Sequence, residues 1–178
     1  GPEIQNHLQA FFEGLALVQY KFDHFKSEPK EKSTNRTLKE VTFISENKFF
    51  HNLQITLLTV SAVGYVKHLV NSPSNIIDSE YLAQQGKQIA KENKYKIEIL
   101  GKRELQKIKA GGILAVNQGS NKDPKLVVLK YSGGNKTETP IVLVGKGVVF
   151  DTGGYNIKHT GNIETMHQDM AGAATVLG

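Results

Sequence analysis

The sequence of 178 residues contains no cysteine. This absence excludes a disulfide framework, a thiolate metal site and a cysteine nucleophile. The sequence also lacks an uninterrupted apolar run approaching the roughly 18–20 residues that span a bilayer, and no basic segment leads into an apolar run near its start. We therefore expect a cytoplasmic protein that neither crosses a membrane nor carries a visible export signal.

Several common catalytic motifs are also missing. There is no G-x-x-x-x-G-K-[ST] phosphate loop, no G-x-S-x-G nucleophile elbow and no H-E-x-x-H zinc motif. The histidines are scattered, which favours surface or packing roles over metal ligation: His7, His24, His51, His68, His159 and His167. The chemistries that depend on those motifs are therefore excluded.

The composition is that of a globular domain, with 39% hydrophobic and 22% charged residues. Its 22 Lys and Arg residues exceed its 17 Asp and Glu residues, which leaves a net charge of +5 and permits nonspecific attraction to phosphate. The charge is dispersed. In the polar segment 26–40 basic residues alternate with acidic ones, so a solvated connector is favoured there over a nucleic-acid patch.

Apolar periodicity predicts helices over residues 3–19 and 51–70, followed by a turn around Pro73 that is the candidate domain boundary. Beyond it, Asp78 is the expected N-cap of a helix that runs to about Asn93. Further helices are predicted at 104–110 and 163–178, and strands at 41–44, 95–99, 113–116, 126–129 and 141–150. This alternation predicts an α/β fold with a mostly parallel central sheet flanked by helices. In such a sheet the ligand site lies beyond the strand ends, here after Phe150.

Four charged residues follow or flank the last predicted strand. Lys146, Asp151, Lys158 and Asp169 are separated by steps of 5, 7 and 11 residues, and Thr152-Gly153-Gly154 lets the backbone turn sharply after Asp151. Two carboxylates and two amines that converge at a strand end would suit a divalent metal such as Mg, Mn or Zn. The same residues could instead form buried salt bridges, which residue spacing alone favours over a metal site.

The sequence around these residues resembles the leucine aminopeptidase (cytosol aminopeptidase) family of two-metal exopeptidases. The strongest likeness is in VGKGVVFDTGGYNIK and MHQDMAGAATVLG, which resemble the family's metal-binding core. NSPSNIIDSEYLAQQGKQIA resembles its domain junction, GGILAVNQGSNKDPKLVVLKYSGG the strands before the site, and EGLALVQYKFDHFK the end of its N-terminal domain. The resemblance thus spans nearly the whole sequence.

The resemblance implies a role for each matching residue. Lys146, Asp151 and Asp169 match metal ligands, and Asp151 matches the one that bridges both ions. Lys158 matches the catalytic lysine that polarises the scissile carbonyl and contacts substrate. Met166 matches a wall of the pocket for the substrate's first side chain, whereas His167 matches no functional position.

The resemblance also implies an organisation and an activity. Residues 1–50 would be the C-terminal end of the N-terminal domain, 51–70 a linking helix and 71–178 the first part of a truncated catalytic domain. The activity would be removal of N-terminal residues, leucine-like ones preferred, by a hexameric enzyme that uses two divalent ions, Mn or Zn first among them, with peptides as its partners and substrates.

One family feature is not found in this sequence. The family completes its site with a later Asp-x-Glu-x-Arg segment, so we expect an internal fragment that is inactive by itself. Two alternatives remain. The chain could be a DNA-binding module, because some family members bind DNA, or a structural remnant without chemistry.

Overall fold

The computed structural model describes residues 2–27, 38–42, 44, 50–135 and 137–178, and it divides the chain into two compact units. Unit 1 is Gly1–His68 and unit 2 is Leu69–Gly178, so the division falls inside the long helix α2, Phe50–Asn71. The predicted domain identities remain predictions, and each unit is described by itself.

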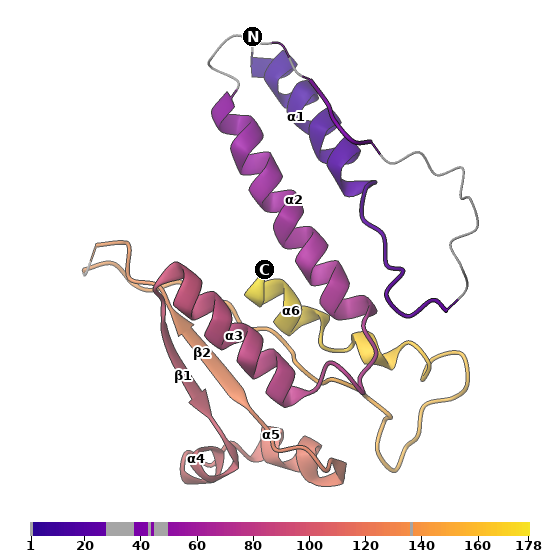
Figure 1. The fold of residues 1–178 in the computed structure, drawn as a ribbon. Coiled ribbons are helices and arrows are strands. Elements are labelled where there is room, and N and C mark those ends of the chain that lie inside the picture. The colour runs from indigo at the N-terminus through magenta and orange to yellow at the C-terminus, as the bar shows by residue number, and fades with distance from the viewer. Residues whose placement is uncertain (1, 28–37, 43, 45–49, 136) are drawn as a thin grey trace. The chain divides into compact units, whose positions relative to one another are not determined.

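Unit 1 contains helix α1, Pro2–Leu17, and most of α2 (Figure 1), which confirms the two helices predicted from apolar spacing. After α1 the chain returns to α2, where the ring centroids of Phe22 and His68 lie 5.8 Å apart. The predicted strand 41–44 is not confirmed. Its residue Phe43 lies outside the described residues, and the other three belong to no helix or strand.

The prediction that the sequence contains no segment long and apolar enough to span a membrane was wrong for helix α2. Leu53–Asn71 is long and apolar enough to cross a membrane by length and composition, with a mean hydropathy of 1.3. This segment contains no uninterrupted apolar run of that length, because it mixes apolar residues with uncharged polar ones, and Lys67 is its only Asp, Glu, Lys or Arg. Length and composition alone do not show that the helix crosses a membrane.

Unit 2 is built on a two-stranded antiparallel sheet. Its elements in order are α3 (Ser79–Asn93), β1 (Lys96–Leu100), α4 (Lys102–Lys107), α5 (Gly111–Val116), β2 (Leu126–Lys130) and α6 (Ala171–Leu177), with short 3₁₀ turns at Asn117–Gly119 and Met166–Gln168. The register runs from Lys96 opposite Lys130 to Leu100 opposite Leu126. Helix α3, strand β1 and strand β2 confirm predicted elements to within two residues.

Helix α3 covers one face of this sheet. A Cβ added at Gly86 of α3 would lie 2.9 Å from Cγ1 of Val127, so the helix and the sheet approach each other closely at a residue without a side chain. Other side chains of unit 2 are almost fully buried and form its core: Leu69, Ile77, Leu105, Met170 and Ala174.

The mostly parallel sheet was a wrong prediction for the described residues. Helices α4 and α5 both lie at the end of the sheet where β1 finishes and β2 starts (Figure 1), so the chain returns from that end and the strands run antiparallel. The predicted strand 113–116 lies in helix α5, because a short apolar run fits either structure.

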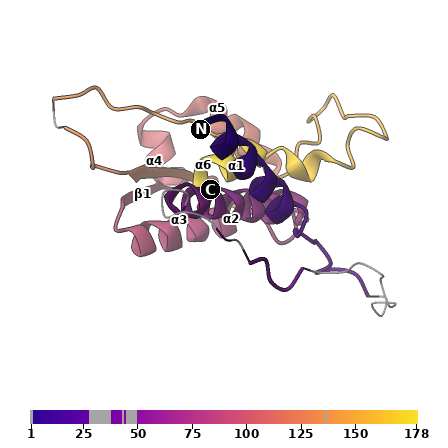
Figure 2. The ribbon, with the colours of Figure 1, turned by 90° about the horizontal axis from the view of Figure 1, so that it is seen from above.

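The predicted strand 141–150 is not a paired strand either. A strand requires a neighbour for its backbone hydrogen bonds, and no described residue pairs with this segment in a sheet. Ile141–Val144 are between 72% and 92% exposed. Residues 131–135 and 151–165 extend from opposite sides of unit 2 (Figure 2). The predicted helix 163–178 is confirmed only in its second half, as α6.

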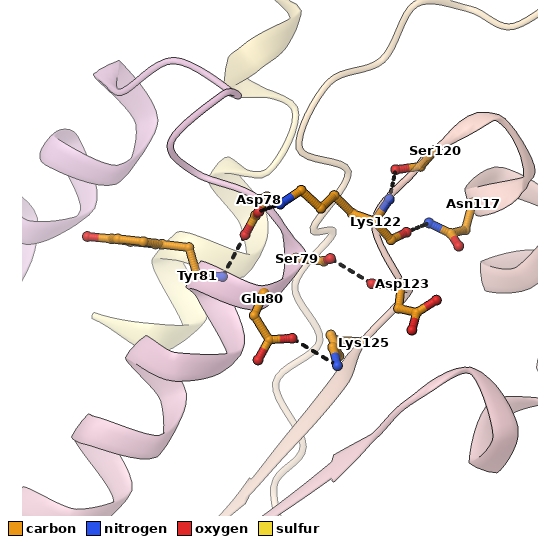
Figure 3. Close-up of polar contacts among 9 residues, drawn as sticks. All are labelled: Asp78, Ser79, Glu80, Tyr81, Asn117, Ser120, Lys122, Asp123 and Lys125. Atoms are coloured by element: carbon orange, nitrogen blue, oxygen red, sulfur yellow. Dashed lines mark hydrogen bonds and ion pairs between the residues drawn. The ribbon is translucent and has the colours of Figure 1, made fainter.

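A polar cluster fixes the start of α3 (Figure 3). Asp78 has the extended backbone of an N-cap, and its Oδ1 accepts a hydrogen bond of 2.8 Å from the backbone N–H of Tyr81. Its Oδ2 lies 2.8 Å from Nζ of Lys122. The Ser79 hydroxyl donates to the carbonyl oxygen of Asp123 at 2.7 Å. The predicted cap is confirmed, and it also ties α3 to the segment before β2.

The double role of Asp78 gives a stability prediction. Asp78→Ala removes cap and ion pair and should cost about 1 kcal/mol or more of unfolding free energy, whereas Asp78→Asn retains a capping oxygen and should cost less. The ion pair with Lys122 lowers the pKa of the Asp78 carboxyl below 3.8, so its stabilisation is present above that pH and is lost as the pH falls through the lowered pKa. Urea unfolding should therefore show the deficit of Asp78→Asn at pH 7, and the deficit should shrink as the pH is lowered below 3.8. An equal deficit at pH 7 and below pH 3.8 would contradict the assignment.

Candidate metal and active site

Two segments that are distant in sequence lie side by side and carry the predicted site residues. The backbone N–H of Ala173 donates to the carbonyl oxygen of Lys146 at 2.8 Å, and the N–H of Asp151 donates to that of Met166 at 3.4 Å. Residues 152–165 form the loop that the second of these contacts closes. The pairing brings residues 146 and 151 to the start of α6.

Two glycines make this approach possible. A Cβ at Gly145 would collide with the carbonyl oxygen of Gly172, and a Cβ at Gly172 would lie 2.8 Å from the backbone nitrogen of Lys146. Both contacts are with backbone atoms, which cannot rotate away as a side chain can. Larger residues at these two positions would therefore push the segments apart.

The close approach places Lys146 beside Asp169. Nζ of Lys146 forms an ion pair with Oδ2 of Asp169. The lysine side chain is 57% exposed and the aspartate side chain 19% exposed. The carboxylate is thus mostly covered by protein, while the amine approaches it from the solvent.

A tight loop returns Lys158 to Asp151. The backbone N–H of Gly153 donates to Oδ1 of Asp151 at 2.9 Å, and the N–H of Lys158 donates to the carbonyl oxygen of Thr152 at 2.9 Å. Gly153 has φ +86° and Gly154 has φ +69°, both in the left-handed region that favours glycine. Nζ of Lys158 then lies 3.4 Å from Oδ2 of Asp151.

The charges of these residues form one cluster. The hydrogen bond from Gly153 lowers the pKa of the Asp151 carboxyl, and the nearby ammonium groups of Lys158 and Lys146 lower that pKa further. Asp151 is thus held as an anion. Because Lys146 acts on Asp151 and is paired with Asp169, it links the two carboxylates.

Lys158 and Met166 share a cleft of about 450 Å³ next to this cluster. The other lining residues are mostly polar: Asn156, Ile157, His159, Asn162 and Thr165. The cleft therefore brings the predicted catalytic lysine and the predicted pocket wall together, as a substrate site would need.

The structure places the four charged residues as two ion pairs, and both pairs are partly exposed rather than buried. Sequence reasoning missed Gly145 and Gly172, which bring the pairs together. The sequence signal for these two glycines was the small residues around them in VGKG and AGAA, because two glycine-containing segments can approach each other closely through their backbones. It also missed His159, Asn162 and Thr165, which have no distinguishing pattern in sequence.

The donor set is suitable for a divalent cation. Carboxylate oxygens of Asp151 and Asp169 and the amine of Lys146 are the kinds of atom that bind Mn or Zn where thiolates are absent. In the structure each of these carboxylates pairs with a lysine ammonium, and that ammonium carries the positive charge that a bound metal ion would supply. No cluster of three or more Asp, Glu, His or Cys side chains occurs among the described residues, so the amine is needed to complete three donors.

Residues 64–178 match the cytosol aminopeptidase family, catalytic domain. This chain belongs to that family. The match covers both segments of the site, and it confirms the resemblance read from the motifs.

Relatives of known sequence carry the same family name. The probable cytosol aminopeptidase of Protochlamydia amoebophila is 39% identical over 173 residues, a stretch that covers 96% of this chain and 35% of that protein. That of Phytoplasma australiense is 41% identical over 170 residues, covering 93% of this chain and 33% of that protein. The chain spans about a third of the length of the curated relatives it matches.

Solved structures agree with this assignment. The cytosol aminopeptidase from Coxiella burnetii has a TM-score of 0.78 and 26% identity, covering 96% of this chain and 34% of that one. The bottromycin maturation enzyme BotP in complex with Mn has a TM-score of 0.76 and 28% identity, covering 95% and 34%. The chain therefore has the fold of the corresponding part of these proteins.

The contact between Gly145 and Gly172 gives a testable consequence. Gly145→Ala should separate Lys146 from Asp169 and lower the unfolding free energy by about 1–3 kcal/mol, as overpacking does. Gly112→Ala is the matched control, because a Cβ there meets no atom within 4 Å and the position lies in helix α5. It should leave stability unchanged or raise it slightly. Crystal structures and urea unfolding of both variants would test this, and an intact ion pair in Gly145→Ala would contradict the role of the contact.

Proposed function

We propose that the protein to which this chain belongs is a metal-dependent aminopeptidase that removes N-terminal residues from peptides. The observation that carries the proposal is the meeting of two Asp–Lys pairs at one place, next to a cleft lined by Lys158 and Met166. Family membership supports the reaction class. Because the chain spans about a third of its relatives' length, the activity is proposed for the whole protein and not for these residues alone.

Lys146, Asp151 and Asp169 would hold two divalent cations, with Asp151 shared between them. Mn and Zn are the favoured metals, and a solved relative is described as a complex with Mn. Bound cations of this kind lower the pKa of a water molecule and anchor a substrate's free amine. Asp151 suits metal binding because the Gly153 N–H and two ammonium groups lower the pKa of its carboxyl and keep it ionised. The amine of Lys146 has a lone pair to offer only after it loses its proton.

Lys158 would stabilise negative charge on the scissile carbonyl oxygen. Its contact with Asp151 at 3.4 Å is long for a charged hydrogen bond, and its side chain lines the cleft. The ammonium can therefore donate to a carbonyl oxygen placed in the cleft without losing a strong partner. A fixed donor aimed at developing charge is among the largest contributions to catalysis.

Met166 and Ile157 would form the apolar wall for the first side chain of the substrate. A leucine-like residue would bury its methyl groups against them. The remaining lining is polar, so the preference over smaller residues is expected to be modest, about 1–3 kcal/mol for a methylene-scale difference.

The whole protein would complete the site and the assembly. We propose that further ligands come from segments beyond these residues, that the isolated chain is inactive, and that the full protein is a cytoplasmic hexamer. Its relatives' names place those proteins in the cytosol.

Substitution of the charged site residues tests the proposed chemistry. In the full-length protein, Lys158→Ala should lower kcat for an aminoacyl chromophore by about 10²–10³-fold, because a charge-stabilising donor is lost. Asp151→Asn should lower activity at least as much, and a chelator should abolish the wild-type activity until Mn or Zn is restored. Matched controls are Lys107→Ala and Asp123→Asn, both at exposed positions of unit 2 outside the site. A wild-type kcat in Lys158→Ala would contradict the proposed role of Lys158 in stabilising charge on the carbonyl oxygen.

A second substitution tests the pocket. Met166→Ala should reduce the ratio of kcat/KM for leucyl over alanyl substrates about tenfold, because the buried contact of the longer side chain is lost while the reacting atoms are unchanged. The measurement is a pair of progress curves with the two chromogenic substrates. An unchanged ratio would show that Met166 does not contact the substrate's first side chain.

A further inference from the structure

A second cleft lies at the end of the β1–β2 sheet. It has a volume of about 190 Å³ and is lined by Lys94, Tyr95, Lys96, Lys130 and Tyr131, among others. The C-terminal end of α3 and the start of β1, which form it, lie on the side of unit 2 away from loop 151–165 (Figure 1). It is therefore separate from the candidate active site.

Two of its lysines face each other across the sheet. Lys96 and Lys130 are direct cross-strand partners in the antiparallel register. Side chains at such positions lie on the same face, and like charges directly opposite each other destabilise a sheet. Among the described residues neither lysine forms an ion pair, and nor does Lys94.

The nearest acids in sequence do not balance these charges. Glu98 lies on the same face of β1 as Lys96, but it is opposite Val128 and forms no ion pair with any described residue. Glu92 instead accepts a hydrogen bond of 2.9 Å from Gln88. Lys94 is itself in the left-handed conformation, φ 57°, at a helix end where glycine is the usual residue. Three cations thus line one cleft, and none of them forms an ion pair with a carboxylate of the described residues.

Two tyrosines accompany the cations. The rings of Tyr95 and Tyr131 meet edge to face, with centroids 5.6 Å apart, and Tyr131 is 76% exposed. A Cβ at Gly133 would collide with Oη of Tyr131, so this ring position requires a glycine there. The Tyr131 ring thus passes close to Gly133 and touches Tyr95, while most of its surface faces solvent.

We propose that this cleft binds a nucleotide. The phosphates would lie among the ammonium groups of Lys94, Lys96 and Lys130, where charge-assisted hydrogen bonds are strong and the repulsion between opposed lysines is relieved. The base would lie against the exposed ring of Tyr131, because every base has a face that stacks on an aromatic side chain. The volume suits phosphate groups, with the base outside on the ring. This inference does not rest on the proposed peptidase activity.

Calorimetric titration of the full-length protein with ATP, tripolyphosphate and adenosine tests the proposal. ATP should bind, tripolyphosphate should bind about tenfold more weakly because stacking is lost, and adenosine should show no binding. Lys96→Gln and Lys130→Gln should each weaken ATP binding at least about tenfold, since each removes a charged hydrogen bond. Tyr131→Ala should lower the affinity for ATP to that measured for tripolyphosphate.

Three controls show whether ATP binds at this cleft. Lys102→Gln, at an exposed position of α4, should leave ATP affinity unchanged. Asp151→Asn should also leave it unchanged, so that failure of the nucleotide site and failure of the peptidase site are distinguishable. Without ligand, Lys96→Gln should raise the Tm, because it removes the like-charge pair, whereas Lys102→Gln should not.

Specific outcomes would overturn the proposal. Unchanged ATP affinity in both Lys96→Gln and Lys130→Gln would show that ATP binds elsewhere. Equal affinity for ATP and tripolyphosphate would show that the cleft binds phosphate groups without recognising the base, which contradicts a nucleotide site. Binding of duplex DNA without any binding of ATP would assign the lysines to a nucleic-acid surface instead.

Discussion

The candidate site depends on one backbone contact, the approach of Gly145–Lys146 to Gly172–Ala173. A hydrogen bond of 2.8 Å closes it, and the absence of two side chains permits it. Lys146 and Asp169 are 23 residues apart, yet this contact makes them partners. The loop between them is closed in turn by Asp151, whose N–H reaches Met166 and whose carboxylate receives Gly153 and Lys158. The chemistry of the side chains therefore rests on glycine positions that carry no chemistry themselves.

The charges at this site are balanced in a way that suits its proposed use. Two ionised carboxylates can lie close together only if cations accompany them. Lysines supply that compensation in the folded chain, because Lys146 and Lys158 each pair with one aspartate. An arrangement of this kind allows the acids to remain ionised and accessible, as Asp151 does at 34% exposure. Full burial would instead have favoured neutral acids or fixed salt bridges.

Local signals in the sequence were sufficient for much of the fold. The Asp78 cap and helix α3 followed from capping chemistry, β1 from alternation and β2 from a short apolar run, all of which are short-range properties. The strand direction, the helix at Gly111–Val116 and the unpaired run Ile141–Val144 were missed because they depend on which segments meet in space. The same distinction holds at the site. Its four charged residues were found from residue type and family motif, whereas the glycine contact and the polar lining of the cleft required coordinates.

The two lysine clusters of unit 2 show why net charge alone is a poor guide to function. A charge of +5 looked dispersed along the sequence, since basic and acidic residues alternate. In the folded chain Lys146 and Lys158 are compensated by aspartates, while Lys94, Lys96 and Lys130 gather at one end of the sheet and form no ion pair among the described residues. Of these two clusters, the first is therefore neutral and the second is cationic. The second can still attract an anion, and its two tyrosines favour an anion that carries an aromatic base.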